Sequence, residues 1–106
     1  MGEFHRAMGE IELEEGSMRS MDLGGEHVLL SKIGGQVYAV SGTCTHQETD
    51  LGLGFFLDGG VVCPLHLSRF DLKTGAVDNP PAIIPLKRFN VKIQDATIFV
   101  DVKGDS

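Results

Sequence analysis

Residues 44–66 read CTHQETDLGLGFFLDGGVVCPLH, and both cysteines of the chain lie in this stretch, each closely followed by a histidine. Thiolate sulfur and imidazole nitrogen together suit zinc or iron–sulfur chemistry, whereas calcium and magnesium prefer oxygen ligands. A disulfide is the alternative in a secreted domain, but the amino terminus lacks the basic start and apolar core of a secretory signal. We therefore expect one metal site with four ligands: Cys44, His46, Cys63 and His66.

The segments on both sides of this stretch have the patterns of β-hairpins. Residues 28–40 contain two β-favouring runs separated by Gly34 and Gly35, which supply the positive φ angles of a tight turn. Residues 89–102 alternate apolar and polar side chains around a turn at 94–96, which predicts strands with one buried face. The two ends of the chain therefore predict a β scaffold.

Between the hairpins the sequence changes to glycine-rich turns and the pair Pro80-Pro81, with no amphipathic stretch of helical length. We predict an all-β chain that forms a single domain over residues 1–106. Its scaffold comprises about residues 1–42 and 82–106, and an insert of about residues 43–81 contains the expected metal ligands. Loops on a rigid scaffold are where binding sites are usually built.

Composition and charge exclude several classes of function. The chain is 42% hydrophobic and 23% charged, which are ordinary values for a folded domain. Its net charge of -6 disfavours a nucleic-acid partner, because phosphates repel an acidic protein. No apolar run is long enough to span a membrane. We therefore expect a cytoplasmic protein with neither a membrane nor a nucleic-acid partner.

The two Cys/His pairs, the sequence RFDLKTG at residues 69–75 and the pair Pro81-Ala82 together resemble the Rieske ferredoxins. Residues 12–16 and 35–40 extend this resemblance over nearly the whole chain. It implies two stacked antiparallel sheets with a smaller, loop-rich cluster-binding subdomain at one tip. It also implies one [2Fe–2S] cluster, with both cysteines on one iron and both histidines on the other.

The same resemblance implies a function. A Rieske ferredoxin is a one-electron carrier that passes electrons from a reductase to an oxygenase or another acceptor. It has no substrate chemistry of its own, so no catalytic residue is expected, and we expect a monomer whose partners are redox proteins. Two neutral imidazoles in place of two thiolates raise the potential to roughly −150 to +300 mV, against about −400 mV for plant-type ferredoxins.

Departures from the membrane-bound respiratory Rieske proteins indicate the soluble ferredoxin class. The respiratory proteins have two extra cysteines that form a disulfide between the ligand loops, and Thr49 and Leu65 occupy those positions here. They also have a serine and a tyrosine that donate hydrogen bonds to sulfur atoms at the cluster, and this chain has Ser68 but Phe70. Because one of these two hydrogen-bond donors is present and the other is absent, we predict a reduction potential between those of the respiratory proteins and the ferredoxins. The alternative for Ser68 is a solvated loop residue.

Two further positions near the expected cluster are informative. Leu67 stands where both classes commonly have a small residue, so either its backbone is ordinary or its side chain shields the cluster from water. By resemblance, Pro81 belongs to a third loop that covers the cluster, and the alternative is loop stiffening. His5 and His27 read as surface histidines without a ligand role. Leu51, Leu53, Phe55 and Phe56 read as packing under the insert, and exposure of one or two of them would suit docking of a partner.

Two other functions fit part of the pattern. A structural zinc module also uses two cysteines and two histidines, although the Cys-x-His order of the first pair is unusual for it. An electron-transfer subunit of a larger reductase complex fits the same motifs. An oxygenase needs a second iron held by two histidines and a carboxylate, and only two other histidines remain, far apart in the sequence. The acidic run that contains Glu12, Glu14 and Glu15 reads as a solvated edge.

Overall fold

The computed structural model describes residues 3–45, 49–64, 68–79 and 84–103. Regular structure in these ranges is mostly β-strand, which confirms the expected all-β class. Two short 3-10 helices, η1 (Glu10–Glu12) and η2 (Leu51–Leu53), complete it. The strands are β1 (Phe4–Gly9), β2 (Met18–Leu23), β3 (Glu26–Ile33), β4 (Gln36–Ser41), β5 (Phe55–Leu57), β6 (Gly60–Val62), β7 (Arg69–Asp71), β8 (Val77–Asn79), β9 (Arg88–Gln94) and β10 (Thr97–Asp101).

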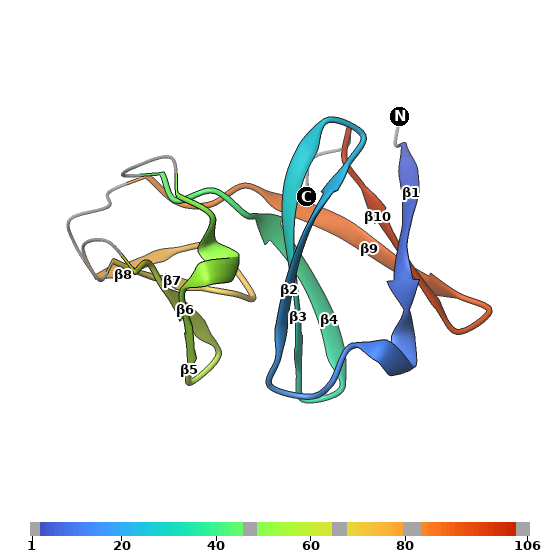
Figure 1. The fold of residues 1–106 in the computed structure, drawn as a ribbon, viewed down its shortest axis with the longest axis horizontal. Helices are drawn as coiled ribbons and strands as arrows, with labels where there is room; N and C mark the ends of the chain where they lie inside the picture. The colour runs from blue at the N-terminus through green and yellow to red at the C-terminus, as the bar shows by residue number, and fades with distance from the viewer. Residues whose placement is uncertain (1–2, 46–48, 65–67, 80–83, 104–106) are drawn as a thin grey trace.

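The strands form a larger and a smaller antiparallel sheet, which lie side by side (Figure 1). The larger sheet has the order β1-β10-β9-β4-β3-β2, and the smaller has the order β5-β6-β7-β8. The chain leaves the larger sheet after β4, forms the whole smaller sheet, and returns at β9. The smaller sheet therefore lies in the insert at one tip of the molecule, and the segments before and after the insert share the larger sheet.

The larger sheet is joined in its middle by only two described residue pairs between β4 and β9, Ala39↔Phe89 and Val40↔Arg88. On one side of this narrow join lie β1, β10 and β9, and on the other lie β4, β3 and β2. Buried side chains from both halves pack into one apolar cluster, which includes Met8 of β1 and Leu30 of β3. The two halves of this six-stranded sheet thus share one core, which corresponds to the two stacked sheets that the resemblance implies.

Strand β3 is buried on both of its faces. Its residues Val28, Leu29 and Leu30 are each 0% exposed. Successive side chains of a strand point to opposite faces, so Val28 and Leu30 enter the scaffold core, whereas Leu29 packs with Phe70 in a second core shared with the insert. One continuous apolar run in the sequence thus joins the scaffold to the insert.

Both predicted hairpins are confirmed. Gly34 and Gly35 connect β3 to β4 with φ angles of 61° and 80°, which glycine adopts without the steric cost of a side chain. Asp95 and Ala96 connect β9 to β10 with φ angles of 54° and 57°. Their tight turns fix the register of the long strands on either side.

Strand β2 was missed by the sequence analysis. It pairs with β3 from Met18↔Ser31 to Leu23↔Glu26. The sequence MRSMDL has no β-branched or aromatic residue, so its intrinsic strand signal is weak. The available signal was the Gly-Gly turn that follows it, where Gly24 and Gly25 have φ angles of 55° and 86°.

Glu15 is exposed, as expected, but it also fastens a turn. Its carboxylate accepts hydrogen bonds from the backbone N–H groups of Gly34 and Gly35, at 2.6 and 2.9 Å. These two bonds hold the pKa of the Glu15 carboxyl below its ordinary value, and the bond from Gly35 has the larger effect. The acidic segment before β2 is therefore bound to the tip of the β3–β4 hairpin.

Candidate metal centre

Cys44 is the first residue of a short loop whose two ends are joined. Just after β4, Thr43 forms an isolated antiparallel bridge with Asp50. The N–H of Cys44 donates a hydrogen bond to the carbonyl of Thr49, at 2.9 Å. We call residues 44–49 the first ligand loop. Its two ends lie side by side and are joined by backbone hydrogen bonds.

Cys63 is the first residue of a second loop with the same closure. It follows β6, and its N–H donates a hydrogen bond to the carbonyl of Ser68, at 2.8 Å, just before β7 begins at Arg69. Residues 63–68, which we call the second ligand loop, thus span the same number of residues as the first. Each loop has a cysteine at its start and is closed by a bond from that cysteine to the residue five positions later.

Both cysteines are buried in the core between the insert and the scaffold. Cys44 is 3% exposed and Cys63 is 2% exposed, and both belong to the apolar cluster that contains Leu51, Val61 and Phe70. Neither cysteine forms a disulfide. Two buried thiols, each at the start of a closed loop, fit the thiolate half of an iron–sulfur or zinc site.

The other expected ligands, His46 and His66, lie outside the described residues, as do Leu67 and Pro81. Within the part of the chain that the structure describes, no group of three or more Cys, His, Asp or Glu side chains is placed to bind a metal. The structure thus shows where the two cysteines lie, and the assignment of all four residues as metal ligands stays a prediction.

Ser68 and Phe70 are both buried beside the second ligand loop. Ser68 is 1% exposed, so the alternative that it is a solvated loop residue is wrong. Phe70 is 0% exposed and lies opposite Val61 in the β6–β7 ladder. An aromatic ring at this position fills the core close to Cys63 but offers no hydroxyl donor.

Arg69 fastens the strands of the insert to one another. Its guanidinium forms an ion pair with Asp78 of β8 and donates hydrogen bonds to the carbonyls of Leu57 and Asp58, both at 2.8 Å. Leu57 and Asp58 lie at the turn between β5 and β6. This one side chain therefore joins β7 to both neighbouring parts of the smaller sheet.

His27 does more than the surface role expected of it. Its ring atoms Nδ1 and Nε2 lie 2.7 Å from Asp22 Oδ1 and 2.9 Å from Asp50 Oδ1. The hydrogen bond with Asp50, and to a lesser extent that with Asp22, raises the pKa of His27. Burial alone would lower this pKa, but its effect is smaller. The sequence analysis missed this group because Asp50 is distant from His27 along the chain and no short motif links them.

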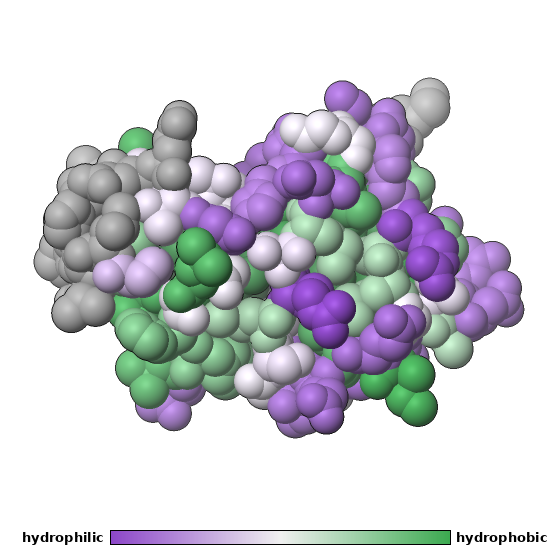
Figure 2. Space-filling model, viewed as in Figure 1, coloured by the Kyte–Doolittle hydropathy of each residue, from purple (hydrophilic) through white to green (hydrophobic). Residues whose placement is uncertain are grey.

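Several apolar side chains of the insert are exposed. Leu53, Phe55 and Leu57 are 72%, 60% and 52% exposed, and Figure 2 shows apolar side chains gathered over the insert beside the grey loops. The expectation that residues 51–56 pack under the insert is therefore wrong for Leu53 and Phe55. It is confirmed for Leu51, which is 0% exposed, and for Phe56, which packs against the same core. Exposure of Leu53 and Phe55 fits the docking alternative.

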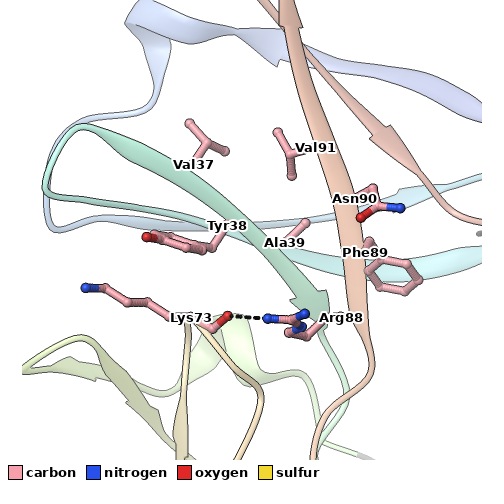
Figure 3. A pocket seen from close by; sticks show the side chains of 8 residues that line it. All are labelled: Val37, Tyr38, Ala39, Lys73, Arg88, Phe89, Asn90 and Val91. Carbon is pink, nitrogen blue, oxygen red and sulfur yellow. Dashed lines mark hydrogen bonds between the residues drawn. The ribbon is translucent and has the colours of Figure 1, made fainter. Parts of the chain in front are cut away.

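A cleft of about 210 Å³ lies where β4 and β9 part (Figure 3). It is lined by residues 37–39 of β4, residues 88–91 of β9 and Lys73 from the turn after β7. The Arg88 guanidinium donates a hydrogen bond to the Lys73 carbonyl, at 3.4 Å, across this cleft. Neither cysteine lines it, so the cleft is separate from the candidate metal centre.

No helix in the described part of the chain has the length and apolar content needed to cross a membrane.

Comparisons with known proteins agree with the geometry. The sequence matches the model of the Rieske [2Fe-2S] domain over residues 3–90. It is 34% identical over 93 residues to the ferredoxin component of biphenyl 2,3-dioxygenase from Rhodococcus jostii (strain RHA1), covering 88% of this chain and 87% of that protein. It is 36% identical over 89 residues to apoptosis-inducing factor 3 from Homo sapiens, covering 84% of this chain but 15% of that protein. The solved ferredoxin of carbazole 1,9a-dioxygenase from Nocardioides aromaticivorans IC177 is similar with a TM-score of 0.87 and 32% identity, covering 92% of this chain and 95% of that one.

Proposed function

Because the chain belongs to the Rieske [2Fe-2S] domain family, we propose that it is a ferredoxin-type carrier that passes one electron at a time from a reductase to an oxygenase. Its cofactor is one Rieske-type [2Fe–2S] cluster, which supplies a one-electron redox couple when bound. The observation that carries the proposal is the pair of equivalent loops, each of which begins with a buried cysteine and contains a histidine. The relatives that resemble it over most of their length are ferredoxin components of dioxygenase systems.

We assign the two ligand types by their positions in the loops. Cys44 and Cys63 lie in the core at the loop starts, so they suit the more deeply placed iron. His46 and His66 follow two and three residues later in the sequence, toward the middle of each loop, and suit the iron nearer to solvent. Uncharged imidazoles on that iron lower the cost of adding an electron, which favours a potential above that of all-cysteine clusters.

The exposed apolar side chains beside these loops favour docking of a redox partner. Phe55 lies opposite Val62, the residue just before Cys63, so this side chain borders the second ligand loop. Ile84 is 57% exposed, and its carbonyl accepts a hydrogen bond from the Thr45 hydroxyl in the first ligand loop, at 2.5 Å. An apolar rim around both loops suits a partner that must approach them closely for electron transfer.

The potential offers a test of Ser68. We propose that its hydroxyl donates a hydrogen bond to a cluster sulfur, which favours the reduced and more negative state, whereas Phe70 has no such donor. A differential of roughly 1 kcal/mol for one hydrogen bond corresponds to about 40 mV for one electron. Ser68→Ala is therefore expected to lower the potential by about 40 mV in a redox titration. An unchanged potential contradicts this role.

The proposal also covers the location, oligomeric state and domain organisation of the chain. We propose that the chain works in the cytoplasm as a monomer, without catalysis of its own, and that residues 1–106 form one domain with the insert at about 43–81. Co-purification tests the alternative that the chain is a subunit of a larger reductase complex.

The absorption spectrum, the iron and sulfide content and the electron paramagnetic resonance spectrum of the reduced protein test the proposal directly. A coloured protein with two irons and two sulfides per chain and a Rieske-type signal supports it. A colourless protein that holds one zinc and gives no signal overturns it in favour of the structural zinc module.

A further inference from the structure

The first ligand loop is connected to the scaffold through a histidine to which the proposed function gives no role. His27 lies near the start of β3, directly opposite Asp22 of β2 in the register. Its Nδ1 lies 2.7 Å from Asp22 Oδ1, and its Nε2 lies 2.9 Å from Asp50 Oδ1. Asp50 is the residue that immediately follows the loop. We call His27, Asp22 and Asp50 the His27 clamp.

His27 contacts both stems of the first ligand loop. Its carbonyl accepts a hydrogen bond from the N–H of Gly42, at 2.9 Å, on the stem that leads to Cys44. Its ring binds Asp50 on the stem that returns from the loop. A Cβ atom on Gly42 would lie 2.6 Å from His27 Cδ2, so the ring packs against the backbone of the leading stem. A single residue of the scaffold thus joins the two ends of the loop.

The charge of the clamp follows from its geometry. Carboxylate oxygens on both ring nitrogens require both nitrogens to donate, so His27 is an imidazolium in the clamp. Burial raises the pKa of the Asp50 carboxyl, but the hydrogen bonds from His27 and Gly52 outweigh it and leave that pKa below its ordinary value. Neither β4 nor η2 contains a charged residue, and Glu26 is the neighbouring charge on β3. Asp22 and Asp50 are therefore the charged groups that face the ring among the described residues.

We propose that His27 is a positioning residue, which as a cation between Asp22 and Asp50 keeps the two stems of the first ligand loop together and so slows loss of the metal bound at Cys44. This proposal rests on the proposed function for the identity of that metal. The pKa of His27 is raised on folding, so its contribution is complete below about pH 6.5 and is lost as the pH rises through the raised value. The contribution of Asp50 is lost only as the pH falls below about 4.

Two measurements on the protein as isolated test the clamp: hydrogen exchange by mass spectrometry, and the rate of metal loss to a chelator. His27→Ala is expected to speed exchange in residues 41–45 and 49–52 but not in residues 89–102, and to speed metal loss about fivefold at pH 6. His27→Gln, whose uncharged amide can donate to Asp50 but supplies no positive charge, is expected to restore only a small part of the wild-type behaviour and to abolish its pH dependence. His5→Ala is the matched control, because His5 also contacts one carboxylate but lies on β1.

The pH dependence separates positioning from general stability. The ratio of the metal-loss rates of His27→Ala and wild type is expected to fall toward one as the pH rises through the pKa of His27. Exchange that is unchanged in residues 49–52, or that increases equally in residues 89–102, overturns the proposal, as does a rate ratio that does not vary with pH. A protein isolated with zinc overturns the proposed electron-carrier function but leaves the exchange measurement as a valid test of the clamp.

Discussion

The larger and the smaller sheet are stabilised in different ways. In the scaffold, β2, β3 and β4 have six to eight residues each and pair along their length. In the insert, every described strand has three residues. Short ladders leave the insert more dependent on its shared core with the scaffold, on the Arg69 hydrogen bonds and on the closures of the two cysteine loops. Long backbone ladders contribute many hydrogen bonds that do not depend on side-chain identity, whereas three-residue strands contribute few.

The largest expected effect is loss of the metal. Cys63→Ala removes one thiolate, so we expect no cluster to be retained and the insert to lose most of its order. Hydrogen exchange is expected to become fast in residues 55–79 while residues 89–101 stay protected. This result sharpens the contrast between the two sheets. Simultaneous loss of protection in both segments contradicts it, because the scaffold would then depend on the metal as well.

Phe70→Ala is expected to have the next largest effect. The side chain is 0% exposed in the core shared by the insert and the scaffold, so truncation leaves a cavity and costs about 3–5 kcal/mol in the free energy of unfolding. Phe89→Ala is the matched change in the scaffold core, where Phe89 is 4% exposed. Urea unfolding followed by circular dichroism measures both. Only Phe70→Ala should also speed cluster loss, and equal rates in the two variants contradict the separation.

Arg69→Ala is expected to weaken the insert alone. It removes two hydrogen bonds to carbonyls and the ion pair with Asp78. The side chains of Arg69 and Asp78 are 22% and 37% exposed, so the expected loss in the free energy of unfolding is about 1–2 kcal/mol. Arg88→Ala, which removes one hydrogen bond of 3.4 Å, is the control and should cost less. Exchange in residues 55–62 reports the difference. Equal exchange in the two variants shows that Arg69 does not fasten the smaller sheet.

The smallest expected effect lies in the scaffold. Glu15→Gln keeps one acceptor oxygen but loses the charge that binds Gly34 and Gly35. Because the pKa of Glu15 is lowered on folding, its contribution is present above about pH 4.3 and is lost as the pH falls below that value. Wild type should therefore melt slightly above the variant at pH 7 and at the same temperature at pH 2. A difference that persists at pH 2 excludes the charge as its cause.

Local signals predicted much of this fold. Gly34 and Gly35 between two β-favouring runs fixed the β3–β4 hairpin, and alternation over residues 89–102 predicted β9 and β10. The cysteine positions in the candidate site were predictable because each belongs to a motif of three or four residues. The family resemblance then supplied the stacked sheets and the cluster.

Features that depend on distant contacts were not predictable. The sequence MRSMDL of β2 has weak strand propensity and is a strand because it pairs with β3. His27 looks like an isolated surface histidine until the fold brings Asp50 to its ring. Leu53 and Phe55 are apolar but exposed, because Phe55 lies in β5, the three-residue edge strand of the smaller sheet, and Leu53 lies just before it. Burial and long-range pairing are properties of the assembled sheets, which single-residue preferences do not encode.

The pairing of β1 with β10 has a consequence for the order of events during synthesis. Phe4 lies opposite Asp101, so the larger sheet closes only after β10 has been made, whereas the hairpins of the insert join strands that are neighbours in the sequence. Contacts between distant segments form more slowly than contacts between near ones. Both cysteine loops thus leave the ribosome before the sheet that supports them can close. The two cysteines, which are buried in the folded protein, are therefore exposed to solvent for an interval during synthesis.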